Sequence, residues 1–385
     1  MRAMRLIRML ILTLLFCLVA ACGNQAVSST RLVPTAPPAA AATTTASPST
    51  ATPAATTATS IPTEAAPSLN PLTGLPLEDP ARLEQRPILI KVSNFPRNNR
   101  PQWGLSFADI VFEHYAEGGL TRFSALFFGN EAEMVGPIRS ARFIDLELVQ
   151  MYGAIFAYGS ADYRVREAIA QSKFAERAVT EYPARCPPMC RIDPANLNHL
   201  VSSTEDLREY LEKKGIPDTA VDLSGMDFGP EIPPGGESGT KLEIHYSVGN
   251  FHRWIFNPGA GIYERWQERG ADEVEADLLV DRLTGEAISA DNVILVVVPH
   301  SYITRSPEFV RIELQGEGRA IAFRDGQAFE IRWVRPDGVG ILQYETLAGV
   351  PFALRPGSTW VEMVNTSSEI EERSAGSWWV RFHIP

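Results

Sequence analysis

Short apolar runs separated by turn residues divide the chain beyond residue 70 into two regions of different character. Runs of about four to nine residues that are rich in Val, Ile and Phe and bounded by Gly, Pro or Asn are typical of buried strands. In the first region they predict strands at 88–92, 108–115, 121–129 and 154–159. Apolar positions near helical spacing, with capping residues, predict helices at 140–153, 162–174 and 203–214. The mixture predicts an α/β domain over residues 70–220.

The second region, 241–365, is predicted to be β-rich and mostly antiparallel, and residues 366–385 are predicted to form a further C-terminal strand or tail. "KLEIHYS" alternates apolar and polar residues, and "NVILVVV" is a continuous apolar run of the kind found in central strands. Asp325-Gly326, between two alternating segments, is a strong hairpin signal. The Gly- and Pro-rich stretch 221–240 has no period and marks the expected domain boundary. The predicted fold class is therefore mixed, α/β followed by β-rich.

The first 22 residues indicate where the protein is located. Arg2, Arg5 and Arg8 precede an apolar run at 9–21, which is shorter than the roughly 20 residues that a membrane-spanning helix needs. Small residues then lead into Cys22, so the segment resembles a bacterial lipoprotein signal. That resemblance implies cleavage before Cys22 and lipid on this cysteine, which would anchor the protein to the cell membrane on its extracytoplasmic face. The alternative is an ordinary secretory signal with a chance cysteine.

Residues 23–69 consist mainly of Ala, Thr, Pro and Ser, and are predicted to form a disordered stalk because they lack large apolar side chains. The whole chain has 35 Lys and Arg against 46 Asp and Glu, a formal charge of −11. The predicted signal holds three arginines and no acid, so the mature chain would carry −14. This charge argues against nucleic acid as a partner, although it permits a local basic site.

Four motifs occur in order in the first region: "NPLTGLP", "RPQWGLSFADIVFE", "EGGLTRF" and "VGPIRSARFIDL". In this order they resemble the YerB-like family of bacterial lipoproteins, a two-domain family of unknown function. The second region is similar more loosely, through "RWIFNPGAGIYER", "FRDGQAFEIRW" and "LRPGSTWVEMV". The candidate ligand-binding residues, most of which are positions of these motifs, are Arg100, Gln102, Glu113, Glu117, Gly118, Gly119, Arg122, Arg139, Ser140, Arg142, Asp145 and Asn196.

The chain departs from the family at two places. Members tend to have Pro-His-Asn-Leu before the capped helix, where this chain has an alanine at Ala195. They also tend to carry a histidine in the strand after the "GPIRSAR" helix, where this chain has Phe156-Ala157-Tyr158. If those histidines transfer protons in the family, this chain cannot do so in the same way.

The arginines of "GPIRSAR" are the most informative candidates. A turn at Gly136-Pro137 would place Arg139 at a helix N-terminus, where the helix dipole is already positive. Arg139 and Arg142, with backbone N–H groups and Arg122, could then bind an anion. The alternative is that these arginines pair with neighbouring carboxylates and join two elements of the fold.

Other polar residues suggest weaker alternatives. Glu113, Glu117 and Asp145 could serve as acid and base in a cell-wall hydrolase or transferase, although salt bridges with the arginines are the simpler interpretation. Cys186 and Cys190 are predicted to form a disulfide in an oxidising compartment. The same cysteines with Met189 and His199 could instead bind copper or zinc.

Two groups of residues are predicted to be structural. His245 and His252 flank a predicted hairpin without a third ligand at metal spacing, so no metal or cofactor is predicted. The second region holds six tryptophans, and core packing is the preferred interpretation over sugar stacking: Trp254, Trp266, Trp333, Trp360, Trp378 and Trp379.

The sequence thus predicts a lipid-anchored cell-envelope protein, and a non-catalytic binding or scaffolding protein is the preferred interpretation over an enzyme. Its first domain would bind an anionic envelope ligand, such as a wall polymer, a carboxylated glycan or a peptide terminus, or else a protein partner. The alternative function is the hydrolase or transferase that uses Glu113, Glu117 or Asp145.

Overall fold

The computed structural model describes residues 67–193, 195, 198–271, 274–336, 338 and 340–385. The predicted signal with Cys22, most of the predicted stalk and the candidate residue Asn196 lie outside the described residues. Within the described part of the chain, no helix is both long enough and apolar enough to cross a membrane.

Both regions of the sequence contribute strands to one eleven-stranded sheet. The strands from the second region are, in spatial order, β20 (Gln343–Thr346), β19 (Gln327–Arg335), β18 (Gly316–Arg324), β15 (Asn292–Val298) and β22 (Thr359–Asn365), with β9 (Glu237–Ser238) also paired to β19. The sheet continues into the first region through β2 (Ile110–Glu117), β3 (Leu120–Phe127), β1 (Ile88–Ser93), β4 (Ile155–Ala157) and β5 (Ala178–Val179). The seam between the two regions is the parallel pairing of β2 with β22.

A second, seven-stranded sheet packs against the first. Its strands are β13 (Ala276–Leu278), β12 (Ile262–Glu268), β11 (Asn250–Asn257), β10 (Lys241–Ser247), β24 (Ser377–Arg381) and β23 (Glu369–Ser374), with β14 (Ser289–Ala290) paired to β12. Aromatic rings fill the space between the sheets: Trp254 meets Trp360 with ring centroids 5.1 Å apart, and Phe323 meets Trp378 edge-on at 5.9 Å. Burial of such large rings is the main stabilising contribution of this core.

Three short strand pairs complete the β-structure. They are β16 (His300–Arg305) with β17 (Glu308–Ile312), β8 (Asp227–Phe228) with β21 (Ala353–Leu354), and β6 (Cys190–Arg191) with β7 (Leu200–Val201). The β16–β17 hairpin reaches from the second region onto the first, where Phe309 contacts Phe143 edge-on at 5.6 Å.

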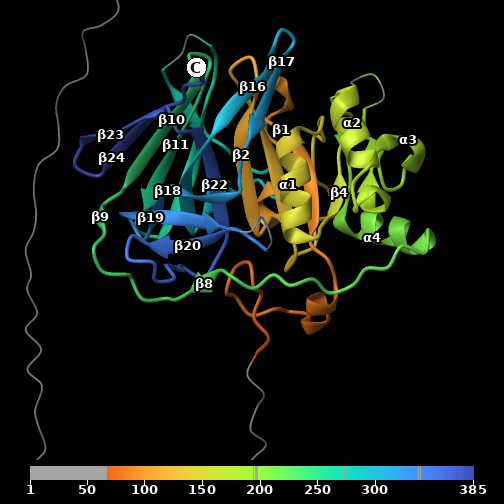
Figure 1. The fold of residues 1–385 in the computed structure, drawn as a ribbon, viewed down its shortest axis with the longest axis horizontal. Helices are drawn as coiled ribbons and strands as arrows, with labels where there is room; N and C mark the ends of the chain where they lie inside the picture. The colour runs from red at the N-terminus through yellow and green to blue at the C-terminus, as the bar shows by residue number, and fades with distance from the viewer. Residues whose placement is uncertain (1–66, 194, 196–197, 272–273, 337, 339) are drawn as a thin grey trace, which may run out of the picture. The chain divides into compact units, whose positions relative to one another are not determined.

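The helices belong to the first region: α1 (Phe143–Tyr152), α2 (Tyr163–Ala170), α3 (Glu181–Ala184) and α4 (Thr204–Lys213). Helix α1 lies along the strands β1 and β2, whereas α2, α3 and α4 gather beyond β4 (Figure 1). On the buried face of α1, Tyr152 packs against Phe112 of β2 with ring centroids 5.8 Å apart. Short 3₁₀ turns at Pro80–Glu84, Arg97–Asn99, Leu105–Phe107 and Ala175–Arg177 connect these elements.

The β-rich, mostly antiparallel second region is as the sequence predicts, and its hairpin turn at Asp325 and Gly326 has the positive φ angles, 53° and 73°, of a two-residue turn. The α/β character of the first region is only partly observed. Strands β1, β4 and β5 are parallel, as in an α/β layer, but β2, β3 and β1 pair antiparallel.

Four of the six tryptophans of the second region are buried in the core, as the sequence predicts: Trp254, Trp333, Trp360 and Trp378. The other two are partly exposed. Trp266 and Trp379 lie on the outer face of the seven-stranded sheet, and the Arg373 guanidinium lies 3.4 Å from the ring centroid of Trp379.

Because one sheet runs through both regions, we expect them to unfold in a single transition. Trp360→Ala at the seam, where the ring is 2% exposed, should lower the free energy of unfolding by about 3–5 kcal/mol. Urea titration followed by circular dichroism would measure this change.

Hydrogen exchange in Trp360→Ala should show faster opening of both β1 and β11. The control Val248→Ala, at an 87% exposed residue, should change little. Faster exchange confined to β11 would contradict the expectation.

Candidate functional site

Three arginines converge beside the start of α1, around a single carboxylate. We call Arg122, Arg139, Arg142 and Glu117 the arginine cluster. The Arg142 guanidinium donates two hydrogen bonds to the Glu117 carboxylate, and its Nε atom lies 2.6 Å from Oε2. The Nη2 atom of Arg122 lies 3.8 Å from the Oε1 atom of Glu117. Glu117 therefore lies between two guanidinium groups and stays one-third exposed.

An irregularity in the β2–β3 hairpin aims Glu117 at Arg142. The register between the two strands shifts between Tyr115 and Glu117, and a bulge of this kind redirects the side chain that follows it. The turn itself is Gly118-Gly119, with φ angles of 59° and 75°. Glu308 of the β16–β17 hairpin accepts hydrogen bonds from the Gly118 amide at 2.8 Å and the Tyr115 hydroxyl at 2.6 Å, which fixes this turn.

The arginine cluster has more positive than negative charge. The Nε atoms of Arg122 and Arg139 are buried and contact no acceptor in the part of the chain that the structure describes. Burial and the neighbouring Arg142 lower the pKa of Arg122 to about 10, and the same two causes lower the pKa of Arg139. Two guanidinium groups pair with Glu117, and Arg139 adds a third positive charge that has no ion pair among the described residues, so this site would gain from an added anion.

A buried polar network under the arginine cluster contains one cation, Lys91, and one carboxylate, Asp145, which pair with each other. The Lys91 ammonium donates to Asp145 at 2.7 Å and to Ser124 at 2.8 Å, and Ser124 donates to Asp145 at 2.7 Å. His114 also contacts Lys91, and burial holds the pKa of Lys91 at about 8 although Asp145 opposes this shift. Asp145 is thus already paired with a cation and does not offset the charge of the arginines.

The predicted placement of Arg139 at a helix N-terminus is wrong. Helix α1 begins at Phe143, with Arg142 as its N-cap residue, whose backbone N–H donates to Asp145 at 2.6 Å. Arg139 lies three residues further upstream, where its N–H donates to the Lys91 carbonyl and its own carbonyl accepts from the Gly159 amide, both at 2.9 Å. Pairing with these segments, rather than a helix N-terminus, brings Arg139 to the cluster.

A second group of charges lies on the opposite face of the same strands. Glu113 of β2 and Glu362 of β22 are direct partners across the parallel seam, so two carboxylates meet in the core. Arg265 of β12 reaches between them from the other sheet, 2.8 Å from Glu113 and 3.3 Å from Glu362. All three side chains are fully buried. We call these three residues and His252 the seam cluster.

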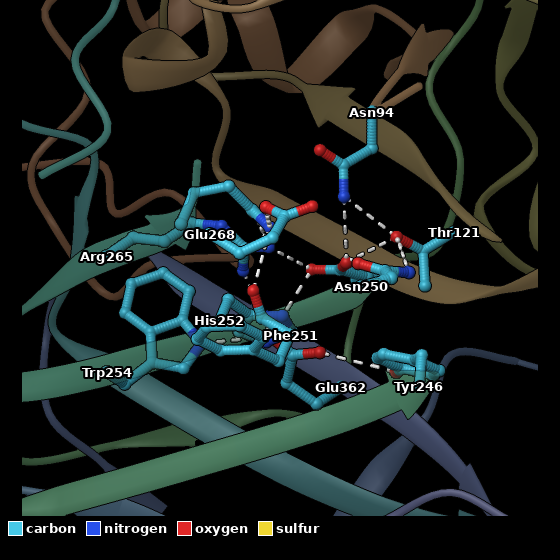
Figure 2. Close-up of polar contacts among 12 residues, drawn as sticks. Asn94, Thr121, Tyr246, Asn250, Phe251, His252, Trp254, Arg265, Glu268 and Glu362 are labelled. Carbon is cyan, nitrogen blue, oxygen red and sulfur yellow. Dashed lines mark hydrogen bonds and ion pairs between the residues drawn. The ribbon is translucent and has the colours of Figure 1, made fainter. Parts of the chain in front are cut away.

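Donors around Glu362 complete the seam cluster, and Figure 2 shows several of them pointing at this carboxylate. His252 Nε2 lies 2.8 Å and Trp254 Nε1 2.9 Å from the same Glu362 oxygen. Burial raises the pKa of Glu362 to about 7 although Arg265 opposes this shift, and burial together with Arg265 lowers the pKa of His252 to about 3. Burial also raises the pKa of Glu113. Near neutral pH, His252 is therefore neutral.

The carboxylates and the imidazole of the seam cluster lie close enough to consider a metal ion. One oxygen from Glu113, one from Glu362 and one nitrogen from His252 lie within 4.8 Å of one another. This arrangement could not be predicted from residue spacing, because the partners of His252 lie more than a hundred residues away along the chain. However, the Arg265 guanidinium already lies against both carboxylates and supplies the positive charge there. These residues therefore do not fit a metal ion.

The remaining candidate residues are engaged within the fold. Arg100 forms a two-pronged pair with buried Glu268, at 2.7 and 3.1 Å, and Gln102 donates to the Ser93 carbonyl at 2.9 Å. The hydroxyl groups of Ser140 and Ser160 form a hydrogen bond of 2.8 Å beside the arginine cluster. The structure thus groups Glu117, Arg122, Arg139, Ser140 and Arg142, and it directs Arg100 and Gln102 to other contacts.

The two cysteines of "RCPPMCR" lie in a surface segment before β7. Cys186 and Cys190 form a disulfide with Cα atoms 4.5 Å apart. In this state neither sulfur is a thiolate, so they cannot bind copper or zinc with Met189, which is 98% buried.

Comparison with known proteins identifies relatives along most of the chain. The N-terminal domain of the family described as "Protein of unknown function (DUF3048)" matches residues 72–217, and its C-terminal domain matches residues 242–361. A protein of Bacillus subtilis (strain 168) named "Putative lipoprotein YerB" is 27% identical over 295 residues, which are 73% of this chain and 82% of the relative. A crystal structure of the Bacillus subtilis YerB protein superposes with a TM-score of 0.66 at 25% identity, covering 77% of this chain and 96% of that chain.

The raised pKa of Glu362 should be visible in the pH dependence of stability. Folded Glu362 keeps its proton up to about pH 7, whereas the unfolded chain releases it near the ordinary value of 4.5. The folded state then binds more protons between these values, so this group's contribution to stability falls as pH rises through the window, by about 3 kcal/mol. Relative to Glu362→Gln, wild type should lose this amount between pH 4.5 and 7 in urea titrations. A difference that does not change with pH would contradict this assignment.

Proposed function

We propose that this chain, which belongs to the YerB-like family with N- and C-terminal DUF3048 domains, is a lipid-anchored protein of the cell envelope that binds an anionic ligand at the arginine cluster without transforming it. The Bacillus subtilis relative is named a lipoprotein, which agrees with the signal and cysteine at the start of this chain. Anchored through Cys22 on the extracytoplasmic face, the folded part would meet wall polymers, carboxylated glycans or peptide termini. All three classes can offer oxyanions.

The observation that carries this proposal is the unmatched charge of Arg122 and Arg139. A buried guanidinium group normally has a carboxylate or several carbonyl groups as partners, because a buried charge without them is costly. Arg122 is 93% buried, yet its described acceptors are only the Thr121 carbonyl at 2.9 Å and the distant Glu117 oxygen. Arg139 is half-buried, and the like charge of Arg142 acts on it. A bound anion would supply the missing acceptors for both side chains.

The geometry favours binding over hydrolysis. A glycosidase needs two carboxyl groups facing the same sugar, and an acid and a base must both reach the substrate. Glu113 and Asp145 are fully buried on opposite faces of the sheet, where Arg265 and Lys91 neutralise them. Only Glu117 among these three carboxylates reaches solvent, and Arg142 holds it. These carboxylates therefore do not supply the acid and base that the hydrolase or transferase alternative needs.

The lipid anchor can be tested on the two cysteines of the signal. In cells given labelled palmitate, wild type should incorporate the label and fractionate with membranes. Cys22→Ala should lose the label, because lipid attachment in this class of signal uses the thiol at the cleavage point. Cys17→Ala, inside the apolar run, should keep it and serves as the matched control. Equal labelling of both variants would refute anchoring at Cys22.

Anion binding can be tested by calorimetry on the full chain in detergent. Soluble wall fragments, inorganic phosphate and acetate serve as probes at low salt. Arg139→Ala should weaken binding of whichever probe binds by about tenfold or more, because it removes a charge-assisted hydrogen bond. Arg139 has no acceptor for its Nε in the described structure, so the variant should remain folded.

Arg319→Ala is the matched control for this experiment. It removes the same charge from a pair with Glu330 that is about half exposed on β18 and β19, so it should leave binding unchanged. No binding of any probe by folded wild type would overturn the proposed function. The same conclusion would follow if Arg139→Ala bound as tightly as wild type.

A further inference from the structure

We infer that Glu117 is a built-in competitor at the arginine cluster: it occupies the place of the ligand's oxyanion, and an incoming carboxylate or phosphate displaces it. This inference rests on the proposed function and describes how the same site is regulated. It comes from the way one carboxylate of the chain is held where three cations converge.

Glu117 is bound as a ligand would be bound. Its two oxygens take the two nitrogens of the Arg142 fork, which is the arrangement that arginine forms with free carboxylates and with phosphates. Arg122 approaches the same carboxylate but remains 3.8 Å away, beyond hydrogen-bond reach. An external oxyanion with two or more oxygens, not tethered to β2, can approach Arg122 and Arg139 as well as Arg142.

Glu117 is also free to leave. It is the last residue of β2, its side chain is one-third exposed, and an exposed turn follows it at Gly118. Space beside Gly118 is open, because nothing lies within 4 Å of where a Cβ atom of residue 118 would be. The turn's backbone stays anchored through Glu308, so that only the Glu117 side chain needs to rotate into solvent.

The other carboxylates nearby cannot play this part. Asp145 is fully buried and held by Lys91, Ser124 and the Arg142 backbone. Glu113 is fully buried on the opposite face of β2, paired with Arg265. Among the described residues of this site, Glu117 alone combines contact with the arginines and access to water. Its departure would leave three guanidinium groups for the ligand.

The test is a comparison of anion affinity between wild type and Glu117→Gln, using the full chain in detergent with inorganic phosphate and acetate as probes. The Arg Nε–Hε resonances of Arg122 and Arg139 report binding, and their Nε atoms have no protein acceptor in the described structure. Glu117→Gln removes the competing charge while keeping the side chain's size, so affinity should rise at least tenfold. The matched control is Glu317→Gln, which removes an equal charge from an exposed pair with Arg332 and should change nothing.

The outcomes separate this inference from the proposed function. A gain for phosphate, for acetate or for both supports the inference and assigns the oxyanion class. Binding by wild type together with equal or weaker binding by folded Glu117→Gln overturns the competitor role and leaves the proposed function intact. If neither wild type nor Glu117→Gln binds either probe, the proposed function fails and this inference fails with it.

A measurement on wild type alone covers the case in which Glu117→Gln does not fold. The Arg142 Nε–Hε resonance reports the 2.6 Å bond to Glu117, and the carboxyl carbon resonance of Glu117 reports the same contact. Saturating anion should shift both, because Glu117 moves into water while the ligand takes its place. A Glu117 resonance that stays unchanged while Arg122 and Arg139 shift would show that the ligand binds beside Glu117, and would overturn the inference.

Discussion

The pairing of Glu113 with Glu362 across the parallel seam is the constraint on which the rest of the structure depends. Two carboxyl groups that face each other in a sheet repel whenever both are ionised, and burial makes the ionised pair more costly. Arg265 of the second sheet places a positive charge against both carboxyl groups. The rings of Phe123, Trp254 and Trp360 surround its guanidinium. The charges therefore specify which strands pair. The seam places two acids together that need the charge of Arg265, and Arg265 reaches them only when the two sheets pack against each other. Removal of Arg265 alone would leave two buried acids uncompensated.

The arginine cluster lies on the other face of the same strands, and its charges are not all matched. Side chains alternate between the two faces of β2 and β3, so that Glu113 and Phe123 face the second sheet whereas His114, Arg122 and Ser124 face α1. On the first face every charge has a partner at hydrogen-bond distance or nearly so. On the second face Lys91 and Asp145 are matched, but Arg122 and Arg139 are not. The stabilising charge pairs and the proposed ligand-binding residues thus belong to opposite faces of one hairpin, and this separation permits a charge surplus on one face while the charges of the other are paired.

Local patterns in the sequence predicted the individual elements well. Strands β1, β2, β3 and β15, the β18–β19 hairpin and the capped helix α4 all follow from apolar runs, turn residues and capping residues. The "GPIRSAR" motif also indicated which arginines belong together. The seam was not predictable, because β2 and β22 lie far apart along the chain and a continuous apolar strand does not specify its neighbour. The position of Arg139 was misjudged for a related reason: its backbone partners, Lys91 and Gly159, are set by tertiary pairing rather than by local propensity.

The rigidity of the seam also supports the proposed binding site, because it holds the cations of the arginine cluster in place. Binding is favoured when the groups that contact the ligand are already held in position, since less conformational entropy is then lost. Arg122 is held because β3 lies within the large sheet, between β2 and β1, and Arg142 is held because its backbone N–H donates to the buried Asp145. The register shift after Tyr115 ends this regular pairing just before Glu117. The fixed cations and the anion that we propose to be displaceable therefore meet at one change in the backbone, at the point where β2 leaves the sheet.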